Sequence, residues 1–402
     1  MPRGSTLRYV NFRASRGRPR PIDEPAAAPD YCNIVNTPDR RGRVRADRPP
    51  GELQMKRFRR PALRAGAVIV LAAVGAAAAS PAAAQGQLNV ICPVQAEWCN
   101  LAAVEFEKET GIKVSMTLKG SGESFAQISA EKANPKLDVW FGGTGDPHLQ
   151  AAELGLLEEY RSSALAQLHP WAQRQAEQSK YRTVGIYLGV LGIGYNTELL
   201  AKKKLGAPAC WRDLTKPEFR NEVQMANPNA SGTAYTAIAT LVQVFGEEEA
   251  FKYLKALHAN INNYPRSGVA PVKAVARGET LASVSFIHDV VTEAQAGFPV
   301  RGAAPCEGTG YEIGSLSIIK GARNLDNAKK FVDWALTPKA QALGAQAKQY
   351  QLPSNTATPV SPLSPKMADI KLIAYDAAKY GTSAERKRLL ERWDREVGSI
   401  AK

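Results

Sequence analysis

The periodicity of hydrophobic and polar positions changes every few residues along the chain, which predicts alternating strands and helices. Gln87–Cys92, Ile112–Leu118 and Leu137–Phe141 are short apolar or alternating runs typical of strands. Glu97–Thr110 has apolar residues at helical spacing between the first two, and a second amphipathic helix follows Gly120-Ser121-Gly122. This order predicts an α/β fold with a mainly parallel sheet and helices on both faces.

Tyr181–Asn196 is a longer extended stretch than one strand of a small sheet needs, and we expect it to carry the chain from one lobe into another. Beyond it the alternation resumes. We expect strands at Val223–Asn227, Leu281–Phe286, Phe298–Ala304 and Ile313–Ile319, and helices at Thr233–Phe245, Glu247–Leu257, His288–Ala296, Leu325–Leu336 and Pro338–Ala347. The charged amphipathic helix Ala384–Val397 is expected to pack on the outside.

The positive charge is concentrated at the front of the chain. The 402 residues are 44% hydrophobic and 22% charged, as in globular proteins, and carry a formal net charge of +14. Residues 1–85 hold 16 basic and 6 acidic residues, whereas the remainder holds 36 and 32. The folded part is therefore nearly neutral, which removes the main support for nucleic-acid binding.

The basic front end has the features of a targeting segment. Met55–Arg60 is a positive stretch, Ala65–Ala79 is apolar but short for a bilayer span, and Ala82-Ala83-Ala84 is a cleavage pattern. We therefore expect a signal peptide at 55–84, with an uncleaved membrane anchor as the alternative. Residues 1–54 are Arg- and Pro-rich, and we expect them to be a mis-assigned leader, with Met55 as the true initiator. The mature protein is then exported, to a bacterial periplasm.

Export affects the interpretation of the cysteines. Cys32 lies in the leader, and four cysteines remain in the mature chain: Cys92, Cys99, Cys210 and Cys306. An even number in an oxidising compartment favours disulfides, with three possible connectivities. A local Cys92–Cys99 bridge with a long-range Cys210–Cys306 bridge is our first choice. The alternative, a thiolate pair that grips a soft metal or an arsenite-like ligand, lacks the usual ligand spacing.

Three glycine- and hydroxyl-rich turns lie where loops enter helices, at residues 120–122, 142–145 and 229–233. Ligands of open α/β sheets bind in this position, and helix N-termini attract anions. For each turn alone, helix capping with a tight turn is the better explanation. Together they predict a polar anion pocket, although none matches a nucleotide-binding fingerprint, so nucleotide hydrolysis is poorly supported.

Acidic and imidazole groups follow two other strands. His288-Asp289 ends an apolar strand, and Glu307 and Glu312 flank a Gly-Thr-Gly-Tyr turn. Such groups can bind sugar hydroxyls, hold a metal or act as acid and base, whereas the simpler explanation for Asp289 is a helix cap. No Gly-x-Ser-x-Gly nucleophile turn accompanies Gly120-Ser121-Gly122, so a hydrolytic triad is disfavoured.

Taken jointly, several segments resemble the periplasmic substrate-binding proteins of ABC importers, in the branch often labelled iron(III)-type. They are the Cys92-Pro93 loop, GSGES at 120–124, DVWFGGTGD at 138–146, GIGYNTELL at 192–200, NPNASGTAY at 227–235, FIHD at 286–289 and EGTGYEIGSLSIIKGARN at 307–324. The resemblance implies a type 2 periplasmic-binding fold, two α/β lobes joined by two hinge strands. Lobe 1 would comprise 87–190 and 312–402, lobe 2 would comprise 191–311, and ligand would bind between them as the lobes close.

The resemblance also implies a ligand class. Branch members that bind ferric iron use adjacent tyrosines, which are missing from the FIHD segment at 286–289. The His-Asp form is similar to members that bind sugar phosphates or related organophosphates. Carried over by position, the hydroxyl-binding residues are His288, Asp289 and Glu312, and the phosphate-binding residues are Ser121, Gly122, Thr144, Ser231, Gly232 and Thr233. Cys92 occupies a position where a Ser or Thr contact is common.

We therefore expect a monomeric, non-catalytic receptor that needs no cofactor and no resident metal. Its partners would be a small phosphorylated solute and an ABC permease of the inner membrane, or a sensor that receives the loaded protein. Two alternatives stay open at this point. One is a receptor for ferric iron, another metal or an oxyanion, which could use His288, Glu312 and the cysteines. The other is an exported phosphate-ester hydrolase.

Overall fold

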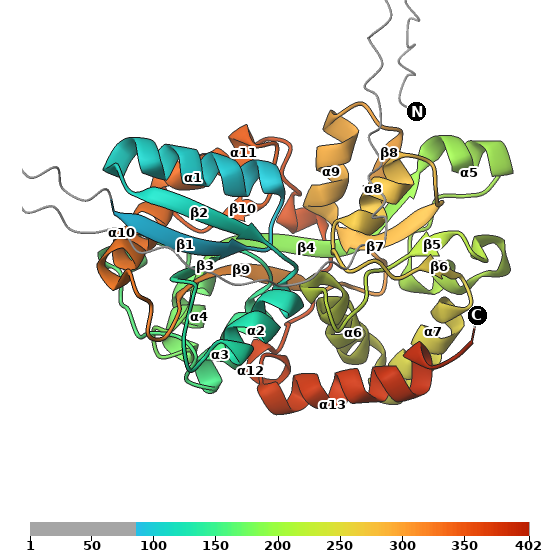
Figure 1. Ribbon diagram of the computed structural model, residues 1–402. Coiled ribbons are helices and arrows are strands. Elements are labelled where there is room, and N and C mark those ends of the chain that lie inside the picture. The colour runs from blue at the N-terminus through green and yellow to red at the C-terminus, as the bar shows by residue number, and fades with distance from the viewer. Residues whose placement is uncertain (1–85, 402) are drawn as a thin grey trace, which may run out of the picture. The chain divides into compact units, whose positions relative to one another are not determined.

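The computed structural model of the protein describes residues 86–401 (Figure 1). The expected leader, the expected signal peptide and Cys32 lie outside the described residues. Within residues 86–401, no helix is both long and apolar enough to cross a membrane.

The first lobe is built on three parallel strands covered by helices. Its strands pair in the order β2-β1-β3, and the helices follow the strands as the hydrophobic pattern predicts. Strand β1 is buried, and Phe106 packs edge-on against Phe331 and Trp334 beneath the sheet. The elements are β1 (Gln87–Cys92), α1 (Ala96–Thr110), β2 (Lys113–Leu118), α2 (Ser121–Ala130), β3 (Val139–Phe141), α3 (Gly145–Glu153), η1 (Ser163–Gln167), α4 (Pro170–Gln178), α10 (Leu325–Ala335) and α11 (Pro338–Gln346).

The second lobe has its own parallel strands and its own hydrophobic core. Strand β5 lies between β6 and β7, and Trp211, Tyr235 and Phe251 are among the largest buried side chains. The elements are α5 (Thr197–Lys203), η2 (Trp211–Thr215), η3 (Pro217–Phe219), β5 (Val223–Gln224), α6 (Gly232–Phe245), α7 (Glu247–His258), β6 (Ile261–Asn263), α8 (Ala270–Ala276), β7 (Ala282–Phe286), α9 (Ile287–Gln295) and β8 (Val300–Ala303).

Two long strands, β4 (Val184–Asn196) and β9 (Tyr311–Ile318), connect the lobes. Along its first half β4 pairs with β9 and with β10 (Leu352–Pro353), and along its second half it pairs with β7 and β8. One ten-stranded sheet therefore runs through both lobes. Eight of its strands follow the order β2-β1-β3-β9-β4-β7-β5-β6, and the other two, β8 and β10, pair with β4 off this path. The expectation that the long extended stretch carries the chain between lobes is confirmed.

The expectation of a mainly parallel sheet is confirmed for β1, β2 and β3, the segments on which it was based, but it does not hold for the sheet as a whole. Every strand that pairs with β4 runs antiparallel to it, and β9 is also antiparallel to β3. The reason is topological, because one crossing strand leaves the first lobe and the other returns to it. Hydrophobic periodicity carries no information about strand direction, so the sheet is mixed.

The C-terminal segment contains η4 (Met367–Asp369), α12 (Ala377–Tyr380), α13 (Ser383–Trp393) and the π-turn η5 (Asp394–Gly398). Not all of 312–402 belongs to the first lobe, contrary to the expectation from the sequence. Leu389, Trp393 and Val397 pack into the core of the second lobe. The lobe boundaries at 190/191 and 311/312 stay predictions.

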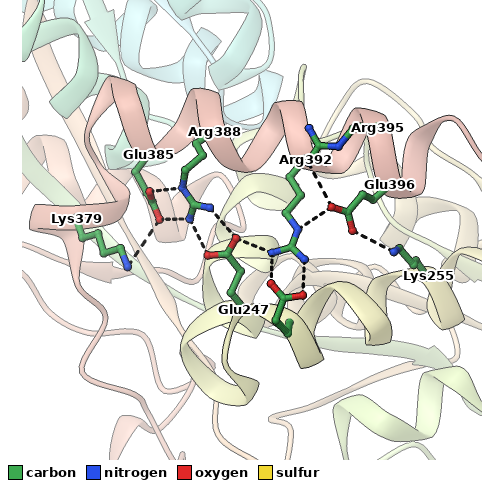
Figure 2. A network of polar contacts seen from close by, with 9 residues as sticks. Glu247, Lys255, Lys379, Glu385, Arg388, Arg392, Arg395 and Glu396 are labelled. Atoms are coloured by element: carbon green, nitrogen blue, oxygen red, sulfur yellow. Dashed lines mark hydrogen bonds and ion pairs between the residues drawn. The ribbon is translucent and has the colours of Figure 1, made fainter.

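Ion pairs fasten α13 to α7 of the second lobe (Figure 2). Arg388 and Arg392 both bind the Glu247 carboxylate, and Arg392 also binds Glu248. The hydrogen bond from Arg388, followed by the one from Arg392, lowers the pKa of Glu247 to about 2. The charges predicted for this helix therefore face the second lobe as well as solvent.

Both expected disulfides are present. Cys92 bonds to Cys99, seven residues away, and Cys210 bonds to Cys306, 96 residues away. The long bridge ties the loop before η2 to the segment that leads into β9. Because all four sulfurs are in disulfides, no thiolate of residues 86–401 is left for a soft metal.

Candidate functional site

Three helix N-termini from both lobes meet at one point. Helix α3 begins after Thr144 and α2 begins at Ser121, whose hydroxyl accepts a 3.1 Å hydrogen bond from the Thr144 amide. Helix α6 begins at Gly232, and a Cβ atom there would overlap Thr144 Oγ1. Only glycine permits this approach of α6 to α3. The positive ends of three helix dipoles therefore face the same small volume.

The Thr144 hydroxyl is the unsatisfied group at this junction. It is buried, and among the described residues its Oγ1 atom finds no hydrogen-bond partner. A buried hydroxyl without a partner is costly, so an acceptor at this position would be stabilised. An anion is such an acceptor, and the helix ends add to its stabilisation.

Two of the predicted turn residues have other contacts. The Gly122 amide donates to the Ala230 carbonyl oxygen of the second lobe at 3.1 Å. The Ser231 hydroxyl caps α6 by accepting a 3.4 Å hydrogen bond from the Ala234 amide. Both residues hold the two helix ends in place.

His288, Asp289 and Glu312 come together beside this junction. His288 and Asp289 lie in the first turn of α9, directly after β7, and Glu312 is the second residue of β9. The His288 Nε2 atom is 3.5 Å from Asp289 Oδ1 and 3.9 Å from Glu312 Oε1. All three side chains are buried, and among residues 86–401 the Nδ1 atom of His288 has no hydrogen-bond partner.

Burial disfavours the charged form of each of these groups. It lowers the pKa of His288 to about 3 and raises the pKa of Asp289 to about 7. The pKa of Glu312 is well above its usual value because of burial, with Asp289 and Asp146 as further causes. The cluster is therefore rich in groups that gain from a bound hydrogen-bonding partner.

A cavity of about 40 Å³ lies between the helix ends and this cluster. Six of the nine predicted site residues line it, and among the described residues no lysine or arginine does. The lining residues from the predicted set are Ser121, Thr144, Thr233, His288, Asp289 and Glu312. Gly122, Ser231 and Gly232 lie behind this lining, at the contacts described above.

Sequence reasoning missed three polar side chains that line the cavity: Gln95, Tyr187 and Gln351. Gln95 donates from Nε2 to Asp289 Oδ1 at 2.7 Å, and the Tyr187 hydroxyl accepts from the Gly143 amide at 3.0 Å. Gln95 follows the first strand of the chain, at the same edge as the turns, and this position was an available signal. Tyr187 lies inside an apolar strand, where only the structure shows that it faces the cavity.

Glu307 is not part of this cluster. Its carboxylate accepts hydrogen bonds from the amides of Trp211 and Arg212, at 2.8 and 3.1 Å. It therefore stabilises the start of η2 in the second lobe.

Three close side chains of metal-ligand type lie outside the residues that line the cavity. Within residues 86–401, the one group of three or more close metal-ligand side chains is Cys210, Cys306 and Glu307. Two of its members form a disulfide, which removes the thiolates that would bind a metal.

Residues 134–380 match the family model described as bacterial extracellular solute-binding protein. The chain belongs to this family. Its members are binding proteins rather than enzymes, so this solute-binding protein is not a hydrolase. The likeness to solved structures also confirms the type 2 periplasmic-binding fold that the sequence analysis expects.

Three relatives illustrate the family. The solute-binding protein is 47% identical to the periplasmic binding protein AfuA of Actinobacillus pleuropneumoniae, solved with exogenous fructose-6-phosphate bound, over 79% of this chain and 100% of that one, with a TM-score of 0.77. It is 46% identical to an uncharacterized protein of Haemophilus influenzae, over 81% of this chain and 95% of that protein. It is 28% identical to a putative 2-aminoethylphosphonate-binding periplasmic protein of Salmonella paratyphi A, over 61% and 70%.

Proposed function

We propose that this protein is a periplasmic receptor that binds a small phosphorylated solute, such as a sugar phosphate, between its lobes and delivers it to an ABC permease. The observation that carries the proposal is the buried, unpartnered Thr144 hydroxyl at the junction of three helix N-termini. Export by the expected signal peptide at 55–84 is part of the same proposal.

The phosphate group would occupy the helix junction. Ser121, Thr144 and Thr233 line the cavity there and offer hydroxyl donors, and the N-terminal turns of the three helices add their dipoles. No lysine or arginine among the described residues lines the cavity, so a phosphate would be held by neutral donors and helix dipoles.

The hydroxyl groups of a sugar would face His288, Asp289 and Glu312. Buried carboxyl groups accept hydrogen bonds from hydroxyls, and in their protonated form they can also donate one. A solute that lacks one of these hydroxyls leaves a buried acceptor unpaired, which penalises its binding. AfuA, with fructose-6-phosphate in its solved structure, supports this class of solute.

Binding requires the lobes to separate and close again. Small-molecule pockets measure roughly 300–1,000 Å³, whereas this cavity measures about 40 Å³. The two crossing strands, β4 and β9, are the segments that would absorb a hinge motion.

Calorimetry and thermal shift with a panel of solutes test the proposal. The panel contains fructose 6-phosphate, glucose 6-phosphate, the parent sugars, inorganic phosphate, 2-aminoethylphosphonate and ferric citrate. We expect sugar phosphates to bind and raise the melting temperature, and the parent sugars to have no effect. Binding of ferric citrate alone would contradict the proposal. Binding of 2-aminoethylphosphonate alone would support the assignment of the helix junction to a phosphorus oxyanion. It would mean that His288, Asp289 and Glu312 bind an ammonium group and not sugar hydroxyls.

A further inference from the structure

An ion pair joins the two lobes near the three helix N-termini. Glu123 lies in the first turn of α2 in the first lobe, and Arg266 lies in the loop between β6 and α8 of the second lobe. The Arg266 Nε atom donates to Glu123 Oε1 at 2.7 Å, and Nη2 contacts the same oxygen. These residues are 143 positions apart in the chain, so the pair exists only while the lobes are together.

Both members of the pair are connected to the proposed phosphate site. The second carboxylate oxygen of Glu123 accepts from the Gly120 amide at 3.2 Å and so caps α2 one residue before Ser121. The carbonyl oxygen of Pro265, next to Arg266, accepts a 2.8 Å hydrogen bond from the Asn227 amide, just before the 229–233 turn. The pair therefore links the N-terminus of α2 in the first lobe to the 229–233 turn of the second lobe.

Neither residue lines the cavity, so neither is expected to touch the solute. The Arg266 side chain is 75% exposed and that of Glu123 is 26% exposed. An exposed ion pair contributes little free energy and is screened by salt. Such a pair can hold the lobes together and still release them readily.

We propose that Glu123 and Arg266 are a latch that favours the closed arrangement of the lobes and slows the release of a bound solute. The inference rests on the proposed function for the nature of the solute, but not for the closure of the lobes. Removing either charge should increase the dissociation rate about two- to fivefold. The order of preference among solutes should not change, because the residues that contact them are untouched.

Stopped-flow dissociation of fructose 6-phosphate from four variants tests the latch: Glu123→Gln, Arg266→Gln, both together, and the charge-swapped pair Glu123→Arg with Arg266→Glu. Glutamine at position 123 keeps the capping acceptor and removes only the charge. We expect equal effects from the two single variants, no further effect in the double variant, and partial rescue by the swap. High salt (about 0.5 M) should bring the wild type close to the single variants. Additive effects or no rescue would overturn the latch.

Arg277→Gln is the matched control, because Arg277 pairs with Glu279 inside the second lobe. It should leave the dissociation rate unchanged, and an equal effect in the control would also overturn the latch.

A measurement without any solute separates this inference from the proposed function. Fluorescent labels at exposed positions 136 and 202 would report the distance between the lobes by energy transfer. We expect a smaller closed fraction in Arg266→Gln than in the wild type, also in the ligand-free protein. An unchanged closed fraction would overturn the latch even if sugar phosphates bind. If no phosphorylated solute binds, the proposed function is overturned, but the energy-transfer measurement still decides the latch.

Discussion

Gln95 of the first lobe donates a 2.7 Å hydrogen bond to Asp289 of the second lobe, and both side chains are buried. The contact satisfies one acceptor site of Asp289 inside the cavity. A carboxylate has further acceptor sites, which are available to the hydroxyls of a solute. Asp289 therefore joins the two lobes, and under the proposed function it would also discriminate among solutes.

Asp289→Ala should weaken the binding of sugar phosphates about 10- to 100-fold. The reason is the loss of a buried hydrogen bond to the solute, which leaves the partner group unsatisfied at a cost of about 1–3 kcal/mol. Calorimetry of the variant and of Glu279→Ala, an exposed carboxylate of the same lobe, checks the prediction. Equal affinity of Asp289→Ala and the wild type would show that this carboxylate does not contact the solute.

Asp289→Asn should stabilise the ligand-free protein at pH 8 and do so less at pH 5. Burial raises the pKa of Asp289 to about 7, so the folded state retains a proton that the unfolded chain releases above pH 4. The free energy of unfolding therefore falls as the pH rises from about 4 to 7, by up to about 4 kcal/mol for this group. The lowered pKa of His288 has the opposite effect, but it is common to both proteins.

Thermal unfolding of both proteins across this pH range measures the difference. Asp369→Asn, at an exposed position, is the control that should show no such gain. A pH-independent difference between Asp289→Asn and the wild type would contradict the raised pKa.

Gly232→Ala should reduce solute affinity by keeping the lobes apart. The added methyl group would overlap Thr144 Oγ1 of the opposite lobe, so α6 would have to move away from α3. Gly206→Ala is the matched control, because a Cβ atom there meets nothing within 4 Å. Calorimetry and scattering should show weaker binding and a more open protein for the first variant only. A compact Gly232→Ala protein with unchanged affinity would mean that the two helix ends do not need this close approach.

The two disulfides should contribute unequally to stability. Loop-closure entropy predicts about 4–5 kcal/mol for the Cys210–Cys306 bridge, which spans 96 residues, and about 2–3 kcal/mol for Cys92–Cys99, which spans seven. Urea unfolding of the two Cys→Ala double variants measures both values. A larger loss from the Cys92–Cys99 variant would indicate that packing of this buried pair outweighs chain entropy.

Much of the secondary structure follows from the sequence because the core strands are continuous apolar runs and the long helices have clear periodicity. The strand Ala282–Phe286 and the helix Glu247–His258 lie within one residue of their predicted positions. Short elements such as α8 (Ala270–Ala276) escaped prediction, because seven residues hold too few turns for a period to stand out. The direction of β4 and β9 was not predictable for the topological reason given above.

The candidate site was predictable as far as strand ends and glycine turns reveal it. His288 and Thr144 follow buried strands, and the sheet brings those ends together at the cavity. Tyr187 and Glu123 escaped notice for opposite reasons. Tyr187 lies within an apolar strand, and Glu123 acts through Arg266, a residue 143 positions away whose proximity only the folded chain creates.

The second lobe is completed by a helix from the far end of the polypeptide. Leu389, Trp393 and Val397 fill its core, and the ion pairs of Arg388 and Arg392 lock that helix onto α7. A chain still being synthesised therefore keeps an apolar surface uncovered until residues 383–397 have emerged. Premature truncation removes no cavity residue, yet it would leave half of the molecule without a finished interior and expose it to proteases.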